Sequence, residues 1–537
     1  MEYKKINRLI LLILLLAYAL YAAYYIYQTS FVLEGTRYFV LNDDAMISMR
    51  YAHNFARGFG LVWNPGDAPV EGYTNPLWVI YMAVFHLFPI PPSKISLAIQ
   101  VTGALFMALN MVIVKKITEH FTANPFVIFA AVIITGFYGP LNNWSLLGME
   151  VSVLVWLVGL AVLKTIQALE EERFSPWPYI ILGIGTLVRV DMTVPYLAIF
   201  AFLLIADPAN RKRHLAWGSG LFLAFILSQT AFRLWYYGDP LPNTYYLKVT
   251  GVPFIVRIGK GLYAFVKFAW NMNWIVFLLP FTILLFRRDK YVLLVLLVFL
   301  AQVAYSIYVG GDAWEHKGGA NRYISLAISQ FFILLCLAAE KVFQAISTPI
   351  KSLHKRVPIY VNLGLSAFLL VAMVNINAVL DLNSLKKWIG TAPIEFTVGN
   401  ELYTSIALAI DKVAAEDASI AVQAAGSIPY FTDLYTYDMW GKSDPHIARQ
   451  DVHLPPGLFA GIANFRPGHI KWDYYYSIVG FEPDIVIQMP LDPDISGADT
   501  LAFVDENYTI IEIDGFTMQA RNASPHVLWD QADDIYD

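Results

Sequence analysis

Two adjacent carboxylates, Asp43 and Asp44, are the residues of this sequence best placed to do chemistry. They follow the apolar residues 39–41 and precede a helix-like stretch at residues 45–57. A carboxylate here can cap the helix and gain from the helix dipole. It can instead act as a general base, taking a proton from a sugar hydroxyl as that hydroxyl attacks an anomeric carbon. The residues alone leave both roles open.

The elements that must position this pair belong to a membrane protein. The 537 residues are 57% hydrophobic and only 15% charged, whereas a soluble domain has roughly 25% charged residues. The net charge is −5 and the basic residues form short clusters, which argues against a nucleic-acid partner. The single cysteine, Cys336, excludes an intrachain disulfide and a cysteine-based metal site.

Long apolar runs predict about eleven membrane crossings. The first, at residues 9–27, follows three basic residues and is longer than a signal core, so we interpret it as an uncleaved anchor with a cytoplasmic N-terminus. The other predicted runs lie at residues 95–114, 125–137, 151–166, 179–188, 194–206, 215–236, 274–286, 291–309, 324–339 and 358–379.

The loop charges support this count. Basic residues at 115–116, 211–213, 287–290 and 351–356 all fall inside if the apolar residues 77–88 lie at the outer interface as an amphipathic or re-entrant helix. An odd number of crossings then places the C-terminus outside. We therefore predict a multi-pass protein of the cytoplasmic (inner) membrane with an extracytoplasmic C-terminal domain.

A change of composition near residue 381 predicts two domains. They are a transmembrane domain at residues 1–381, whose first outer loop at 28–76 carries the carboxylate pair, and an α/β domain at residues 382–537. In the second domain we expect a helix at 401–415, strands at 418–423 and 484–488, and a turn at Gly426. Nothing there matches a phosphate-binding P-loop.

Short motifs are spread along nearly the whole chain on its predicted outer face. In chain order they are Asp43-Asp44-Ala45, Arg50-Tyr51-Ala52, Val62-Trp63-Asn64, Glu71-Gly72-Tyr73-Thr74-Asn75-Pro76-Leu77-Trp78, Leu147-Gly148-Met149-Glu150, Arg189-Val190-Asp191, Leu241-Pro242-Asn243-Thr244-Tyr245-Tyr246, Lys248, Gly310-Gly311-Asp312, Asn321-Arg322-Tyr323, residues 441–449 and Gly468-His469-Ile470-Lys471. Together they resemble the GT-C membrane glycosyltransferases. They are most similar to the branch with the mycobacterial arabinofuranosyltransferase that adds terminal arabinose.

The resemblance implies a fold and a reaction. The fold is membrane all-α, a GT-C type bundle of about eleven transmembrane helices with a C-terminal soluble α/β domain. The reaction is inverting transfer of a sugar, arabinofuranose in the nearest branch, from a polyprenyl-phosphate donor to a cell-envelope glycan acceptor. Asp43 is the favoured base and Asp44 the partner that orients or holds the acceptor. Two adjacent carboxylates can raise each other's pKa, which suits a base working near neutral pH. No cofactor is expected.

A departing polyprenyl phosphate calls for cations on the same face. The candidates are Lys248, Arg322, Arg189 and Arg50. Arg189 interrupts an apolar run, where an arginine is costly unless paired, so a structural pair with Asp191 is the alternative. Lys248 and Arg322 follow spans at the outer surface, where long basic side chains often serve as interface anchors.

The matching motifs also supply candidate substrate-binding residues. These are Glu71, Tyr73, Asn75, Glu150, Asn243, Tyr245, His446 and His469. The aromatic residues can equally be membrane-interface anchors, and the two histidines can pack the tail against the membrane domain. We expect Lys248 and Arg322 to contact the donor, and the tail histidines to act on the acceptor. His53 and His316 stand near single carboxylates, a pattern more typical of polar contacts than of a metal site.

Other classes of function remain. Within the enzymes, the main alternative is a ligase that transfers a preassembled glycan from a lipid carrier. A transporter of lipid or sugar would be expected to have charged or broken helices near the bilayer midplane and often an inverted repeat, whereas the polar residues here gather at one face. A purely structural membrane protein would have no need of a carboxylate pair with several cations on the same face.

Overall fold

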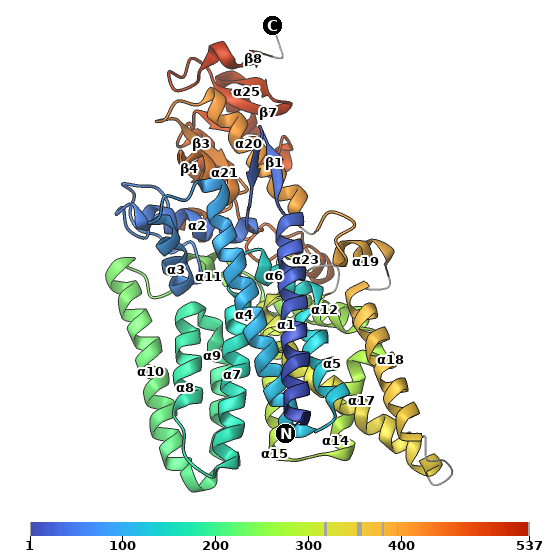
Figure 1. The fold of residues 1–537 in the computed structure, drawn as a ribbon. Helices are drawn as coiled ribbons and strands as arrows, with labels where there is room; N and C mark the ends of the chain where they lie inside the picture. Colours follow the sequence, from blue (N-terminus) through green and yellow to red (C-terminus); the bar gives the residue numbers. More distant parts are fainter. Residues whose placement is uncertain (1, 316–318, 352–356, 379–380, 395, 535–537) are drawn as a thin grey trace. The chain divides into compact units, whose positions relative to one another are not determined.

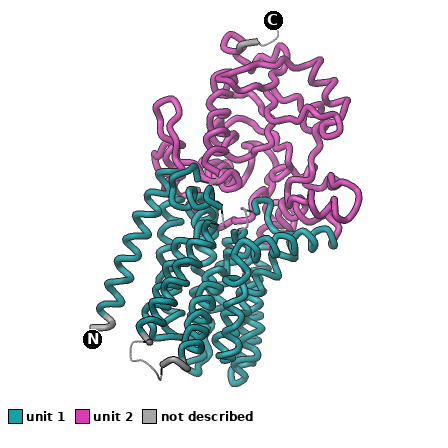
Figure 2. The backbone as a smooth tube through the Cα atoms, turned by 90° about the vertical axis from the view of Figure 1, so that its right-hand side faces the viewer, with its two compact units in different colours: residues 1–28, 99–229, 255–395 teal, residues 29–98, 230–254, 396–537 magenta. Residues whose placement is uncertain are grey.

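The computed structural model describes residues 2–315, 319–351, 357–378, 381–394 and 396–534 (Figure 1). The chain divides into two compact units, coloured separately in Figure 2. Unit 1 comprises Met1–Gln28, Ile99–Gln229 and Ile255–Glu395, and unit 2 comprises Thr29–Ala98, Thr230–Phe254 and Phe396–Asp537. This division differs from a cut at residue 381, because the first outer loop joins the tail in one unit.

Unit 1 is helical. Its helices are α1 (Glu2–Gln28), most of α4 (Pro92–Phe121), α5 (Pro125–Gly136), α6 (Gly139–Leu146), α7 (Val151–Glu170), α8 (Trp177–Val188), α9 (Thr193–Ala206), most of α10 (Arg211–Tyr236), α12 (Phe254–Asn271), α13 (Trp274–Leu278), α14 (Ile283–Phe286), α15 (Lys290–Val309), α16 (Arg322–Ser325), α17 (Ile328–Lys351), α18 (Val357–Ala378) and α19 (Leu382–Trp388).

The predicted apolar runs all coincide with helices. Among the described residues, seven helices are long and apolar enough to cross a membrane, or up to nine if two bent pairs each count as one span. The remaining predicted runs correspond to shorter helices, at Pro125–Gly136, Trp177–Val188, Val190–Ala206 and Trp274–Phe286. Hence the chain is a multi-pass membrane protein, as its composition predicted.

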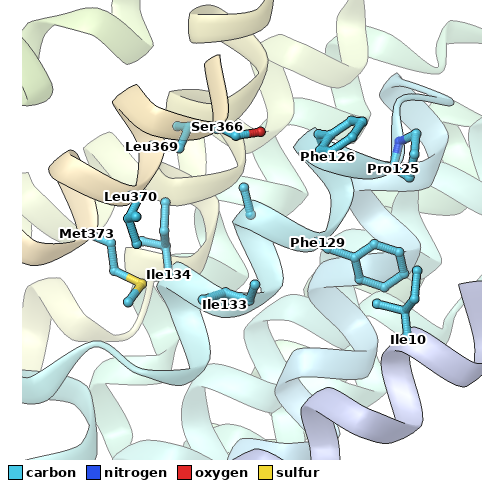
Figure 3. A pocket seen from close by; sticks show the side chains of 11 residues that line it. Ile10, Pro125, Phe126, Phe129, Ile133, Ile134, Ser366, Leu369, Leu370 and Met373 are labelled. Carbon is cyan, nitrogen blue, oxygen red and sulfur yellow. The ribbon is translucent and has the colours of Figure 1, made fainter. Parts of the chain in front are cut away.

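Apolar side chains on the outside of unit 1 are those expected of a lipid-facing surface. On α1, Leu9, Leu12 and Leu16 are each exposed by about three fifths, a pattern that is costly in water and favourable in hydrocarbon. Beside α1 an apolar pocket of about 380 Å³ opens between Ile10, the aromatic residues of α5 and the residues of α18 (Figure 3). Apart from Ser366, the side chains that line this pocket are apolar.

The longest helix outside the predicted runs is α12, which carries Arg257, Lys260 and Lys267 among its apolar residues. It is apolar enough for a span only together with α11, from which it is bent by 88°. Gly261 lies on its face toward α15, where a side-chain Cβ would collide with the backbone of Ile307. The glycine thus allows these two helices to approach closely.

Unit 2 contains a mixed sheet with strand order β4-β3-β5-β7-β6-β8. Its strands are β3 (Ser419–Val422), β4 (Tyr435–Asp438), β5 (Ile485–Val486), β6 (Tyr508–Ile513), β7 (Phe516–Arg521) and β8 (Asp533–Asp534). The strand β3 pairs in parallel with β4 and β5, and the remaining pairs are antiparallel. The α/β prediction for this part is confirmed. Both expected strands are present, and the expected helix is α20 (Thr397–Val413).

Shorter elements complete unit 2. They are β1 (Phe31–Leu33), β2 (Thr36–Tyr38), α2 (Asp43–Ala56), α3 (Pro76–His86), α11 (Asn243–Val249), α21 (Ser427–Thr432), α22 (Pro445–Ala448), α23 (Leu458–Asn464), α24 (Pro493–Ser496) and α25 (Ala498–Asn507). The helix α2 packs on α3 and on α21, and α11 packs on α22. Residues from three distant parts of the sequence therefore meet around the start of α2.

Candidate active site

The carboxylate pair stands in the first turn of α2. Asn42 is the N-cap residue, and its side-chain oxygen accepts a hydrogen bond from the backbone N–H of Asp44 at 3.0 Å. The capping role that the sequence left open for an aspartate is thus filled by Asn42. Both carboxylates remain available for other contacts.

Asp44 forms an ion pair with a lysine of the tail. Its Oδ1 lies 2.6 Å from Nζ of Lys442, and both side chains are more than four fifths buried. Burial alone would lower the pKa of Lys442, but Asp44 and Asp43 together raise it above its ordinary value. Lys442 therefore stays charged beside Asp44.

Asp43 has a different environment. Its Oδ1 accepts a hydrogen bond from the backbone N–H of Ser427 at 2.9 Å. Burial raises the pKa of Asp43, and the neighbouring Asp44 adds to the rise, while Lys442 and the backbone N–H groups of Ser427 and Gly426 oppose it without cancelling it. The result is a pair in which Asp44 is neutralised by a cation and Asp43 holds its proton more tightly than an ordinary aspartate.

Gly426 is required for this arrangement. A Cβ atom at this position would collide with the backbone and the carboxylate of Asp43. Only a glycine lets the turn before α21 come close enough for its N–H groups to reach Asp43.

The loop that carries Lys442 is held by two other side chains. Asp438 accepts hydrogen bonds from the N–H groups of Trp440 at 3.1 Å and Ser443 at 2.8 Å, and burial raises its pKa to about 6. The side-chain amide of Asn243 donates to the carbonyls of Gly441, Lys442 and Asp444 at 3.0 to 3.1 Å. Asn243, predicted to bind substrate, thus lies where it positions the lysine.

Lys248 lies beside the tail motif at residues 468–471. Its Cγ and Cε atoms would each stand 3.3 Å from a Cβ at Gly468, so the lysine stem packs on the glycine backbone. The next residue is His469. Burial is the main cause that lowers its pKa to about 3, the positive charges of Lys442 and Arg466 lower it as well, and Asp44 opposes them. Unit 2 thus places His469 within electrostatic range of Asp44, and Lys248 against the glycine that precedes His469.

Arg50 is buried and bonded to the backbone. Its Nε donates to the carbonyl of Trp63 at 2.9 Å, and its Nη2 donates to Asn64 and to the carbonyl of Leu434 at 2.8 Å. Its Nη1 donates to the carbonyl of Pro429. The structure therefore gives this predicted phosphate ligand contacts that tie α2 to the tail.

Three predicted substrate residues of the first outer loop are also buried. Glu71 receives two hydrogen bonds from Arg233, at 2.7 and 3.0 Å. The hydroxyl of Tyr73 lies 2.6 Å from that of Tyr237, and Asn75 accepts a hydrogen bond from Ser48 at 3.0 Å.

The other two predicted substrate residues of unit 2 are partly open to solvent. Tyr245 is 42% exposed. His446 stacks on Tyr476 with ring centres 4.0 Å apart, and its Nε2 lies 3.3 Å from Asp473.

The remaining predicted residues lie in unit 1 as buried ion pairs. Arg189 contacts both carboxylate oxygens of Asp191, at 2.8 and 2.7 Å, and Glu150 at 2.7 Å. Arg322 contacts both oxygens of Asp312 at 2.6 Å. The pairing of Arg189 with Asp191, one of the two interpretations of the sequence, is present, with Glu150 as a second partner.

Among the described residues, no group of three or more His, Cys, Asp or Glu side chains is arranged to hold a metal ion. His53 lies 3.7 Å from Asp433, and His316 lies outside the described residues.

Sequence reasoning missed three residues of the site: Lys442, Gly426 and Asp438. Lys442 stands inside the tail motif at residues 441–449 that the sequence singled out, and Gly426 was noted only as a turn. A lysine next to a glycine in an outer motif was the available signal. No sequence pattern indicates that Lys442 pairs with Asp44, which lies 398 residues earlier in the chain.

Comparisons with known proteins define the class of fold. Residues 395–528 match a family model described as a domain of unknown function, DUF8728. No curated protein matches the chain. Among solved structures, ArnT from Cupriavidus metallidurans bound to undecaprenyl phosphate is 13% identical, with 96% of this chain and 98% of that chain covered and a TM-score of 0.55.

A second similar structure is the Archaeoglobus fulgidus oligosaccharyltransferase in complex with Zn and sulfate. It is 12% identical, with 94% of this chain and 73% of that chain covered and a TM-score of 0.51. The fold is thus of the GT-C type, a membrane helical part with a small sheet domain, as predicted.

Proposed function

We propose that this protein is an inverting glycosyltransferase that moves a sugar from a polyprenyl-phosphate donor to a glycan acceptor. The observation that carries the proposal is the Asp43–Asp44 pair, whose members have unlike environments. Asp44 forms an ion pair with Lys442, and Asp43 has a raised pKa, as suits a general base working near neutral pH. The fold is shared with ArnT, whose structure holds undecaprenyl phosphate.

In this mechanism Asp43 accepts the proton of the acceptor hydroxyl while that oxygen attacks the anomeric carbon. The bond from that carbon to the phosphate oxygen breaks, and the electron pair leaves with the polyprenyl phosphate. Because attack and departure occur on opposite faces of the sugar, its anomeric configuration inverts. Asp44 holds the acceptor. Because Lys442 pairs with Asp44, the carboxylate of Asp44 does not repel the phosphate of the donor.

The charge of the departing phosphate is stabilised by basic side chains. Lys248 is the strongest candidate among those predicted, because it lies in the same unit as the pair and packs beside the motif at residues 468–471. Since Lys442 and Gly426 of the tail contact the pair, we propose that the tail shapes the catalytic site as well as the acceptor site. The resemblance of the motifs makes arabinofuranose the first donor sugar to test.

The substitution Asp43→Asn tests the base. With a labelled polyprenyl-phosphate arabinose donor and a synthetic arabinan acceptor, transfer should fall by at least about a hundredfold, the usual contribution of a general base. Donor binding, measured by retention of the lipid on the purified protein, should persist. The matched control is Asp494→Asn, an exposed aspartate in the same unit. Normal turnover in Asp43→Asn would show that Asp43 is not the base, and normal turnover in Asp44→Asn as well would overturn the assignment to the pair.

We further propose that the protein lies in the cytoplasmic membrane with the N-terminus inside and the tail outside. The single native cysteine, Cys336, is buried, so one added cysteine reports its own position. A cysteine replacing Asp499 should react with an impermeant maleimide from outside intact cells. Labelling of that site only after the membrane is opened would contradict the proposed topology.

A further inference from the structure

A pocket of about 390 Å³ in unit 2 has no role in the scheme above. It lies among residues 68–71, the residues leading into α11, and α22. Its polar lining includes Glu71, Asp239, Asn243, His446 and Arg449. Pockets that bind small molecules begin at about 300 Å³, so the volume suits a ligand of one or two rings.

The polar side chains of the pocket are held by one another. Arg449 Nη2 donates to Asp239 Oδ2 at 2.6 Å, and its guanidinium lies 4.0 Å from the ring centre of Tyr246. The hydroxyl of Tyr246 donates to the other oxygen of Asp239 at 2.7 Å. Asn243 accepts from Arg449 Nη1 at 3.3 Å. A planar cation and a carboxylate are thus fixed side by side at the pocket wall.

These groups are partly engaged and partly exposed. Arg449 donates to Asn243, Pro445 and Asp239 and also interacts with the Tyr246 hydroxyl. Asp239 accepts from Arg449 through Oδ2, and from the Tyr246 hydroxyl and the Leu241 N–H through Oδ1. The side chains of Arg449 and Asp239 are 41% and 27% exposed. The pocket therefore presents donors and an acceptor together, the combination that a hydroxyl group satisfies because it can both donate and accept.

The charges of the pocket cancel. Arg449 is balanced by Asp239, and Glu71 by Arg233. An anionic ligand would therefore lose its hydration shell without finding a net positive charge, which disfavours a phosphate or a uronic acid. The apolar surfaces of Pro69, Leu241 and Pro445 line the same cavity and match the C–H faces of a sugar ring.

We infer that this pocket binds a neutral sugar residue of the acceptor glycan. The inference rests on the proposed function, since it assigns the acceptor side of the same reaction. Asn243 connects the two regions, because it lines the pocket and also binds the carbonyls of the loop that carries Lys442. A sugar in the pocket thus lies against a side chain that positions the partner of Asp44.

Saturation-transfer NMR on the full-length protein, in a detergent without sugar headgroups, tests the assignment. The probes are the methyl glycosides of arabinofuranose, mannose, galactose and glucose, with glucuronic acid as the anionic comparison. At least one neutral probe should receive saturation, and its dissociation constant should rise about tenfold in Arg449→Lys and in Asp239→Asn, as expected for loss of a charge-assisted hydrogen bond.

The matched control is Arg521→Lys, whose side chain is also 41% exposed and paired with a carboxylate. It should bind the probe as the wild type does. Saturation of no neutral probe, tighter binding of glucuronic acid, unchanged affinity in both pocket variants, or an equal loss in Arg521→Lys would each overturn the inference.

The same probe separates this inference from the proposed function. The Asp43→Asn protein should bind the saccharide normally while transfer is lost. If Asp43→Asn transfers sugar normally and the pocket variants lose the saccharide, the proposed base is wrong and the pocket assignment stands. If Asp43→Asn abolishes transfer and the pocket variants bind normally, only the pocket assignment is wrong.

Discussion

Both units contain buried arginine–carboxylate pairs, Arg233 with Glu71 in unit 2 among them, but the carboxylates at the start of α2 are arranged differently. In unit 1, Arg189 contacts Asp191 and Glu150, and Arg322 contacts both oxygens of Asp312. In unit 2, Lys442 forms an ion pair with Asp44 and also acts electrostatically on Asp43. The first arrangement satisfies each arginine within its own unit. The second leaves one carboxylate with a raised pKa.

This difference indicates which buried charges are suited to proton transfer. A buried arginine with two carboxylate contacts has a fixed geometry, and its removal would leave uncompensated negative charge. A carboxylate whose pKa is raised by burial and a like charge can exchange a proton near neutral pH. We therefore assign stability mainly to the ion pairs of unit 1 and proton transfer to the pair of unit 2.

The largest effect is expected from breaking the Arg189 cluster. Arg189→Gln leaves Asp191 and Glu150 buried without their cation, so the free energy of unfolding should fall by about 3–5 kcal/mol. Titration with SDS in mixed micelles measures it. The control Arg173→Gln removes an exposed pair with Glu171 and should change stability by less than about 1 kcal/mol. Equal losses in both variants would show that burial of the cluster does not matter.

The next effect concerns the close turn beside Asp43. Gly426→Ala places a methyl group against the Asp43 carboxylate and should lower transfer about a hundredfold, since small displacements of a catalytic group cost that much. In Gly399→Ala the added Cβ meets no atom within 4 Å, and transfer should be unchanged. A steady-state transfer assay compares them. Full activity in Gly426→Ala would mean that the turn does not position the base.

A smaller loss is expected at Lys248. Lys248→Gln should raise the donor KM or lower donor hydrolysis about 10- to 100-fold, because a cation at the departing phosphate is lost, while the unfolding midpoint stays near that of the wild type. The control is Lys412→Gln, a half-exposed lysine of the same unit. Arg322→Gln should instead lower the unfolding midpoint. If Lys248→Gln destabilises the protein and Arg322→Gln does not, the assignment of stability to the ion pairs of unit 1 is wrong.

The smallest effect is a shift of a pH profile. Lys442 lowers the pKa of Asp43 from the even higher value that burial and Asp44 would impose. In Lys442→Gln that pKa rises further, so the acidic limb of the pH–rate profile should move to higher pH. Transfer near neutral pH should then fall about tenfold, and Lys412→Gln should keep the wild-type limb. A limb that moves to lower pH would exclude Asp43 as the titrating base.

Much of the fold could be predicted because it follows from local patterns. Apolar runs long enough to cross a bilayer became helices, and the strands expected at residues 418–423 and 484–488 correspond to β3 and β5. The helix α12 escaped prediction because Arg257, Lys260 and Lys267 interrupt its apolar residues. The contacts between the first outer loop and the tail were not predicted either, because hydropathy carries no information on contacts between distant segments.

The sequence by itself determined that the chain crosses a membrane several times and carries adjacent carboxylates at the start of a helix, because hydropathy and helix signals are read over a few neighbouring residues. Only the tertiary structure decided that Lys442 pairs with Asp44 and that the turn at Gly426 brings the backbone N–H of Ser427 to Asp43. The pKa of a carboxylate depends on burial and on charges within a few ångströms. For this pair those neighbours are distant in the chain, since Ser427 lies 384 residues after Asp43 and Lys442 lies 398 residues after Asp44.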